Sequence, residues 1–196
     1  PKILPKFSHY GNGLCVFLSI AAGVKISSIE ALLGQKTPII RAMPNTPAEI
    51  GLGITAQIAN ENVSKDAFEV AGKLLSAIGE VVNLNSEDQM DAVTGVSGSG
   101  PAYVFYLIDA LAVAGRGQGL DKELAMKLAK MTVLGAGKLA ASSSVVPSDL
   151  RVNVTSPNGT TEAGLNILMD NENGLGPLIE KTVAAATARS KELANG

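Results

Sequence analysis

The sequence has little of what many metal sites, hydrolases and extracellular proteins depend on. Its 196 residues include one cysteine, one histidine and no tryptophan. With Cys15 alone, an internal disulfide framework is excluded, and this usage is typical of a reducing compartment. With His9 alone, a Ser-His triad or a histidine-based metal site has almost no candidate residues. We therefore expect no metal site and a cytoplasmic location.

The sequence also lacks an excess of charge of one sign and a long apolar run. Its formal net charge of −2 gives no electrostatic footprint for nucleic acid or an anionic membrane surface. The longest apolar run, residues 14–24, is shorter than the roughly 18 residues that a membrane span needs. No charged region of the secretory type precedes it. We expect neither nucleic acid nor a membrane as a partner.

Apolar residues, in contrast, are abundant. They make up 46% of the chain, whereas charged residues make up 17%. This balance is more apolar than the surface of a typical monomer requires. It indicates additional burial, either in a deep core or between subunits.

The first part of the sequence alternates short apolar runs with helical patterns. This alternation is typical of an α/β sheet with crossover helices. The expected strands are residues 14–20, 38–43, 54–58 and 80–84. One helix is expected to begin near Ser27, and a second is expected at 64–79.

After Ser86 the strand signals end and helices follow one another. We expect them at about 101–115, 121–143, 160–171 and 175–194, which divides the chain into domains 1–86 and 87–196. The helix after Pro101 carries only Asp109 as a charge up to Ala114. A helix that is apolar on every side must be surrounded by protein. Few companion helices are available in one chain, so the pattern predicts an intertwined dimer.

A stretch rich in glycine and hydroxyl groups, residues 91–100, precedes Pro101. Proline fits the first position of a helix because no intrahelical partner awaits its missing N–H. A helix that begins here would direct free N–H groups and a partial positive charge toward Ser97 and Ser99. We therefore interpret residues 91–100 as a loop with a small-anion site.

Two further loops have the composition of binding sites. Residues 153–161 lead into a helix and form either a nest of donors for a carboxylate or an ordinary cap made by Ser156 or Thr160. Residues 43–47 follow a strand, where ligand crevices of open α/β sheets lie. There Asn45 can donate and accept at once, which suits a carboxamide such as that of nicotinamide. A rigid turn with two prolines is the alternative.

Taken together, the segments 19–23, 41–47, 91–103 and 154–161 resemble the motifs of the pyrroline-5-carboxylate reductase family, in the same order. The resemblance extends over nearly the whole chain from about Leu18. It implies an α/β plus all-α fold, in which the C-terminal part of a Rossmann-like sheet is followed by an α-helical dimerisation domain. It also implies a homodimer, and larger rings of dimers are frequent in that family.

The resemblance further implies reduction of the C=N bond of 1-pyrroline-5-carboxylate to L-proline, with NADPH or NADH as cofactor. Thr94 matches the hydroxyl beside the substrate ring nitrogen, as a donor or an orienting group. The residues that match the cofactor site are Ala21, Ala22, Met43 and Asn45. Those that match the substrate-carboxylate loop, in a site shared between protomers, are Val154, Ser156, Thr160 and Thr161.

The sequence departs from the family pattern in several places, and two of them bear on the site. The family begins with a strand, a glycine-rich phosphate loop and a helix, and these are missing here, so we expect weak binding of NAD(P)H. Asn158 stands where the family usually has glycine, although asparagine tolerates a left-handed backbone. A non-catalytic dimerisation module and a reductase of another cyclic imino acid are the alternative functions.

Overall fold

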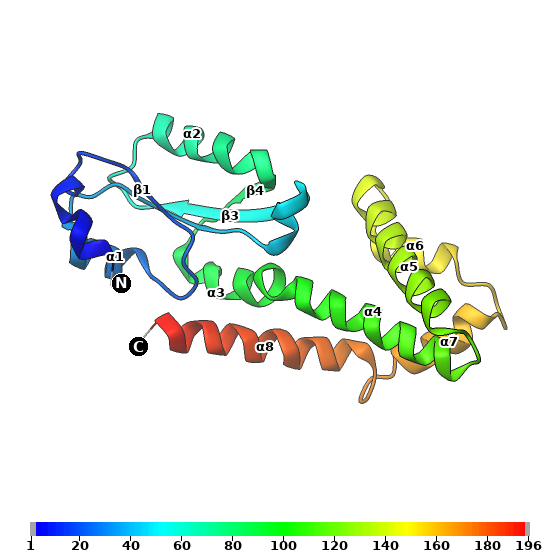
Figure 1. Cartoon of the computed structure of the whole chain (residues 1–196). Helices are drawn as coiled ribbons and strands as arrows, with labels where there is room; N and C mark the ends of the chain where they lie inside the picture. The colour runs from blue at the N-terminus through cyan, green and yellow to red at the C-terminus, as the bar shows by residue number, and fades with distance from the viewer. Residues whose placement is uncertain (1–2, 195–196) are drawn as a thin grey trace. The chain divides into compact units, whose positions relative to one another are not determined.

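The computed structural model describes residues 3–194 and has two compact units (Figure 1). The sheet unit comprises the chain up to Pro101 together with the residues from Thr182 onward. The helical unit comprises Ala102–Lys181. The last helix, α8 (Leu175–Ala194), contributes residues to both units.

The sheet unit contains a four-stranded mixed sheet. Its strands lie in the order β1 (Phe17–Ser19), β2 (Ile39–Met43), β3 (Gly53–Ala59) and β4 (Gly79–Asn83). The pairs β1–β2 and β3–β4 are parallel, and β2–β3 is antiparallel. Helices α1 (Ile26–Leu33) and α2 (Lys65–Leu75) make the two parallel crossovers. The predicted alternation of strands and helices is thus confirmed, although only three residues of the expected strand 14–20 pair.

The core of the sheet unit forms where α1 packs on the sheet. Ile26, Ile29 and Leu33 recur at helical spacing and bury one face of α1 against Ile39 of β2. A helix can bury only one such stripe when its other face meets solvent. The apolar spacing in α1 therefore fixes which face of this helix meets the sheet.

Helix α2 is shorter than the predicted 64–79. Ser64 caps its start by accepting a hydrogen bond from the Ala67 N–H. The helix ends at Leu75, and the 3-10 turn η3 (Ser76–Ile78) leads to Gly79 at the start of β4. Gly79 has φ of 142°, and a Cβ there would overlap the backbone of Gly53. The close approach of two strands therefore terminates the helix.

Three further helices lie within a few residues of the predicted ranges: α4 (Gly100–Gly117), α5 (Lys122–Ser142) and α7 (Thr160–Leu168). The other helical elements were not predicted. They are η1 (Leu4–Tyr10), η2 (Thr46–Ile50), η4 (Glu87–Gln89), α3 (Met90–Val93), the π-turn η5 (Thr94–Gly98) and α6 (Pro147–Asn153).

The interpretation of residues 91–100 as a loop with an anion site at a helix start was wrong. The chain is helical throughout from Glu87 to Gly117. The N–H of Ser99 donates to the carbonyl oxygen of Thr94 at 2.8 Å, five residues back, as in a π-helix. Since the backbone at Ser97 and Ser99 is part of a helix, no free helix N-terminus points at these residues.

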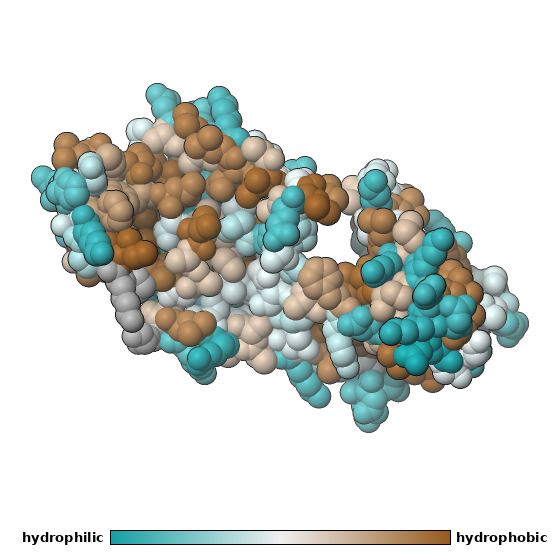
Figure 2. Space-filling model, viewed as in Figure 1, coloured by the Kyte–Doolittle hydropathy of each residue, from teal (hydrophilic) through white to brown (hydrophobic). Residues whose placement is uncertain are grey.

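Helices of the helical unit expose most of their apolar side chains. Among the described residues of α4 and α5, only Ala112, Ala125 and Ala129 are buried. Phe105 and Tyr106 of α4 are 60% and 76% exposed, and Figure 2 shows apolar side chains in brown on the visible surface. By length and composition, the helix 87–117 could also cross a membrane, a test that core helices of soluble proteins pass as well.

Candidate functional site

The predicted cofactor residues lie at one edge of the sheet. Met43 is the last residue of β2, and Asn45 follows it. Ser19, the last residue of β1, pairs with Arg41 of β2 in a parallel register. Ala21 and Ala22, which follow shortly after β1, therefore lie at the same edge of the sheet as Met43. Ala21 and Ala22 are exposed. Carboxyl ends of parallel strands are the usual site of ligands in open α/β sheets.

The side-chain amide of Asn45 joins three segments of the sheet unit. Its Nδ2 donates to the carbonyl oxygen of Ser97 at 3.1 Å, and its Oδ1 accepts from the N–H of Ile54 at 2.9 Å. The Ser97 carbonyl is available because Pro101, four residues later, has no N–H to give it. One N–H and one lone pair of the amide are left for a ligand.

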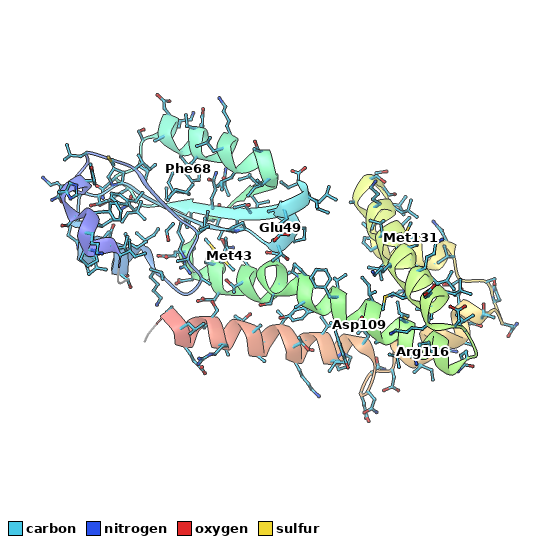
Figure 3. All side chains as sticks on the ribbon, viewed as in Figure 1. Met43, Glu49, Phe68, Asp109, Arg116 and Met131 are labelled. Atoms are coloured by element: carbon cyan, nitrogen blue, oxygen red, sulfur yellow. The ribbon has the colours of Figure 1, made fainter. Side chains whose placement is uncertain are left out.

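The π-turn places Thr94 beside the end of β2. A Cβ on Gly98 would lie 2.7 Å from Cε of Met43 and 3.6 Å from Cγ2 of Thr94. The π-turn and the end of β2 therefore pack closely at Gly98, and Figure 3 labels Met43 where the sheet meets the helical segment. The Thr94 hydroxyl donates to the carbonyl oxygen of Met90 at 2.9 Å. Its oxygen therefore keeps its lone pairs for a donor.

A buried ion pair fixes β2 to the start of the long helix. The guanidinium of Arg41, which is 3% exposed, donates to Glu87 at 2.7 Å. The same carboxylate oxygen of Glu87 accepts from the N–H of Ile26 at 2.9 Å. Our sequence analysis missed this pair. Its signal was an arginine inside a buried strand, because a buried charge needs a charged or hydrogen-bonding partner.

A small charged hollow of about 270 Å³ lies next to this ion pair. Its lining residues are Lys25, Arg41, Glu87, Asp88, Asp91 and Lys191. The carboxylate of Asp91 accepts a hydrogen bond from Ser190 at 2.6 Å. The hollow thus holds charges of both signs.

The predicted carboxylate loop belongs to the helical unit. Val154, Ser156, Thr160 and Thr161 are all exposed. The N-cap of α7 is Gly159, and no side chain caps this helix, so the alternative of capping by Ser156 or Thr160 is wrong. The first N–H groups of α7 are thus left without a side-chain cap.

Asn158 shapes this loop as its residue type suggests. Its φ of 60° is left-handed, which confirms the expected tolerance of asparagine at this position. Its N–H donates to the carboxylate of Glu162 at 2.7 Å. A Cβ on the neighbouring Gly159 would overlap the hydroxyl of Ser156, so this position requires glycine.

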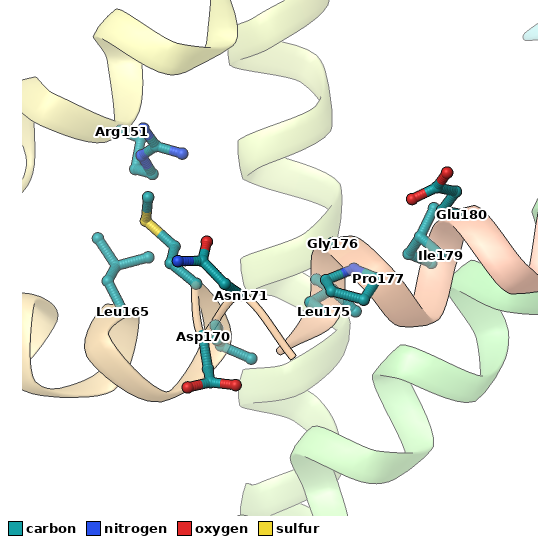
Figure 4. A pocket seen from close by; sticks show the side chains of 11 residues that line it. Arg151, Leu165, Asp170, Asn171, Leu175, Gly176, Pro177, Ile179 and Glu180 are labelled. Atoms are coloured by element: carbon teal, nitrogen blue, oxygen red, sulfur yellow. The ribbon is translucent and has the colours of Figure 1, made fainter. Parts of the chain in front are cut away.

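The helical unit also contains a larger hollow of about 700 Å³ (Figure 4). Leucine, methionine, proline and isoleucine side chains of α7, of α8 and of the turn between them form most of its wall, and Arg151 of α6 lies at one side. None of the predicted site residues lines it. The backbone N–H groups of Asn173 and then Glu172 hold the pKa of Asp170, at its edge, below the usual value of 3.8. Asp170 is thus a turn-forming residue.

Comparison with known proteins identifies the family. Residues 87–193 match the family described as pyrroline-5-carboxylate reductase dimerisation. A pyrroline-5-carboxylate reductase of Pseudomonas aeruginosa is 50% identical over 179 residues, which are 91% of this chain and 65% of the relative. One of Arabidopsis thaliana is 39% identical, over 91% of this chain and 63% of the relative.

Comparison with solved structures points to the same family. A pyrroline-5-carboxylate reductase of Coxiella burnetii superposes with a TM-score of 0.91 at 39% identity, covering 98% of this chain and 71% of that one. The Plasmodium falciparum pyrroline carboxylate reductase, solved with NADP bound, gives 0.88 at 30% identity, covering 98% and 72%.

The chain spans a little under two thirds of the bacterial and plant relatives, 65% and 63% of their lengths. The matches extend over nearly all of this chain and confirm the resemblance in its sequence motifs. They also confirm the fold, a Rossmann-like sheet followed by helices. The chain belongs to the pyrroline-5-carboxylate reductase family.

Proposed function

We propose that the protein reduces 1-pyrroline-5-carboxylate to L-proline with NADPH or NADH, a step of proline biosynthesis in the cytoplasm. The observation that carries this proposal is the contact of the π-turn with the end of β2. Gly98 of this turn lies close to both Met43 and Thr94, at the carboxyl end of β2, and ligands of open α/β sheets bind at such strand ends. The relatives' names and the NADP in the Plasmodium structure support it.

The cofactor, when bound, supplies the hydride. The chain's own residues at this edge fit a flat ring. Ala21 and Ala22 are small and exposed, and Asn45 keeps one donor and one acceptor free. We assign Ala21, Ala22, Met43 and Asn45 to the nicotinamide side of the cofactor.

Thr94 has the role of an orienting group rather than a proton donor. Its proton is engaged by the carbonyl oxygen of Met90. The oxygen is therefore free to accept a hydrogen bond from the N–H of a protonated ring nitrogen. Since hydride adds to the carbon of that C=N bond, holding the nitrogen in place aligns the carbon with the cofactor.

The substrate carboxylate is assigned to the start of α7. Uncapped N–H groups and the positive end of a helix suit a carboxylate. We assign Val154, Ser156, Thr160 and Thr161 to this subsite. We further propose that the loop of one protomer completes the site of its partner, as the resemblance implies.

A homodimer also explains the exposed helices. The dimerisation family covers residues 87–193, and Phe105 and Tyr106 are among the exposed apolar side chains in that range. Burial between protomers, rather than in a membrane, accounts for the apolar helix 87–117. Within this scheme residues 1–86 serve the cofactor and residues 87–196 serve dimerisation and substrate, and rings of dimers are a further level of the same assembly.

Replacing Thr94 with valine tests the assigned site. Loss of the accepting oxygen is expected to lower kcat by about 10- to 100-fold, because a hydrogen bond to a charged group contributes roughly 1.5–3 kcal/mol, while NADPH binding stays unchanged. Thr94→Ser, which keeps the hydroxyl, is the control. Turnover is followed by the loss of NADPH absorbance and binding by nicotinamide fluorescence. Equal losses in turnover and binding would contradict the assignment.

The same measurements separate the alternatives. A stable dimer that does not bind NADPH would be a non-catalytic dimerisation module. A protein that binds NADPH but reduces a six-membered cyclic imino acid faster would be a reductase of that substrate.

A further inference from the structure

The last turns of α8 are joined to the long helix by a buried hydrogen bond. The hydroxyl of Ser190 donates to the carboxylate of Asp91 at 2.6 Å, across 99 positions of sequence. Ser190 is 4% exposed and Asp91 is 9% exposed. A buried carboxylate is costly unless it is hydrogen-bonded. This bond therefore fixes one turn of α8 against α3.

A close backbone contact continues the same seam. A Cβ on Gly95 would lie 2.5 Å from Oγ1 of Thr187 and 3.0 Å from the carbonyl oxygen of Val183. Val183, Thr187 and Ser190 are spaced by four and three residues and therefore share one face of α8. On the long helix, Gly95 contacts this face and follows Asp91 by one helical turn. The seam thus covers the junction between α3 and the π-turn.

The other end of the seam reaches the loop after β1. A Cβ on Gly23 would lie 2.9 Å from Cβ of Leu193. Gly23 directly follows Ala21 and Ala22, which we assign to the cofactor. One face of α8 therefore contacts both the loop that carries those alanines and the turn that carries Thr94.

The π-turn needs such external support. A π-turn inside an α-helix is rare, and this one contains Gly95 and Gly98, which lower helix stability. Its characteristic hydrogen bond, from Ser99 N–H to Thr94 O, closes over the residues that contact α8 and Met43. Without those contacts, the sequence favours a more open backbone.

We propose that the C-terminal turns of α8 are a brace that fixes the π-turn, with Ser190 and Asp91 as positioning residues for Thr94. The conformational part of this inference stands by itself, and its catalytic consequence rests on the proposed function. Thr94 is bonded to Met90, the neighbour of Asp91, so loosening this turn moves the Thr94 oxygen. A displacement of about 1 Å at a reacting centre can cost up to about 100-fold in rate.

Four variants of the purified protein test the brace. Ser190→Ala removes the hydrogen bond and keeps the charge, whereas Asp91→Asn removes the charge and keeps an accepting oxygen. The double variant removes both, so it leaves no unpaired carboxylate and folds even if Ser190→Ala does not. Glu192→Gln is the matched control, because Glu192 lies on the same helix in an exposed ion pair with Arg189.

Two readouts are compared: hydrogen exchange of the Ser99 amide, and kcat and KM for 1-pyrroline-5-carboxylate. In Ser190→Ala and in the double variant we expect about tenfold faster exchange at Ser99 and about tenfold lower kcat, with KM changed less than about twofold. Asp91→Asn should change the exchange of the Ser99 amide and kcat only slightly, and Glu192→Gln should leave both unchanged.

Unchanged exchange at Ser99 in both Ser190→Ala and the double variant would overturn the brace. Faster exchange with an unchanged kcat per folded molecule would overturn the positioning role. If the parent protein reduces no imino acid, the proposed function fails, and the exchange of the Ser99 amide alone decides for or against the brace.

Discussion

The two compact units differ in whether they bury large apolar side chains, although both expose some. The sheet unit buries large side chains such as Ile29, Ile39 and Met90 at 0–1% exposure. In the helical unit, the buried apolar residues are Ala112, Ala125 and Ala129. Its large apolar side chains, Phe105 and Tyr106 among them, stay exposed.

This difference shows where each unit obtains its stability. The sheet unit has an internal core, built by α1 and the strands of the same chain. The helical unit has apolar helices but few buried side chains, so its core must be completed from outside the chain. In our proposal a second copy of the protein completes it, and the sheet unit then provides the cofactor edge while the dimer provides the substrate loop.

The largest expected effect comes from a charge in the exposed apolar surface of the helical unit. Phe105→Asp should abolish the dimer, because a buried unpaired carboxylate at an interface costs roughly 2 kcal/mol or more. Leu74→Asp on α2 is the matched control, since Leu74 is 67% exposed and Phe105 is 60% exposed. Sedimentation should show a monomer for the first variant and a dimer for the second. If both variants remained dimers, the exposed apolar surface of the helical unit would not be the dimer interface.

A core deletion in the sheet unit should come next. Ile40 of β2 is fully buried, so Ile40→Ala should lower the free energy of unfolding by about 2–5 kcal/mol. Because the core of this unit lies within one chain, the loss should not depend on protein concentration. Denaturant titration at two concentrations measures it. A strongly concentration-dependent loss would mean that this core, too, needs a partner.

Overpacking the helical unit should have a moderate effect. Ala112 is 3% exposed on an otherwise exposed helix. Ala112→Leu should therefore cost about 1–3 kcal/mol and, by disturbing the packing of α4, weaken the proposed dimer. The same titration, combined with sedimentation, measures both quantities. Unchanged stability and an unchanged dimer would contradict the packing of α4.

The smallest effect is expected at the turn before α8. The pKa of Asp170 is lowered because its carboxylate accepts hydrogen bonds from the N–H groups of Asn173 and Glu172. The stabilisation is thus present above the unfolded pKa and is lost as the pH falls through the folded pKa. Asp170→Asn should lower the melting temperature slightly at neutral pH and not at acidic pH. Glu172→Gln is the control, and a pH-independent difference would exclude the carboxylate as its cause.

The sequence was sufficient for elements whose pattern is local. The apolar run at 38–43 predicted β2, and the apolar helix after Pro101 predicted the unburied surface of α4. The π-turn was missed because its glycines and serines have low helix propensity, and contacts with α8 and Met43 override that preference. Helix α6 was missed because it has seven residues, too few for a periodic signal.

In the candidate site, too, some features have a local sequence signal and others depend on contacts between distant residues. The motif order predicts Met43, Asn45 and Thr94 as site residues, and the structure brings the end of β2 and the π-turn into contact. The bond between Ser190 and Asp91 could not be predicted, because no local pattern links residues 99 positions apart. The ion pair of Arg41 with Glu87 is an intermediate case, since the buried arginine signals a partner without naming it.

The π-turn also changes which residues of the long helix share a face. A π-turn holds about one residue more than an α-turn, so the side chains after Gly98 are rotated by about 100° relative to a regular continuation of α3. Helical-wheel reasoning carried through Thr94 therefore assigns the downstream residues to the wrong faces. Deleting one residue between Thr94 and Gly98 would make the helix regular, turn α4 about its axis, and change the side chains that the proposed dimer buries.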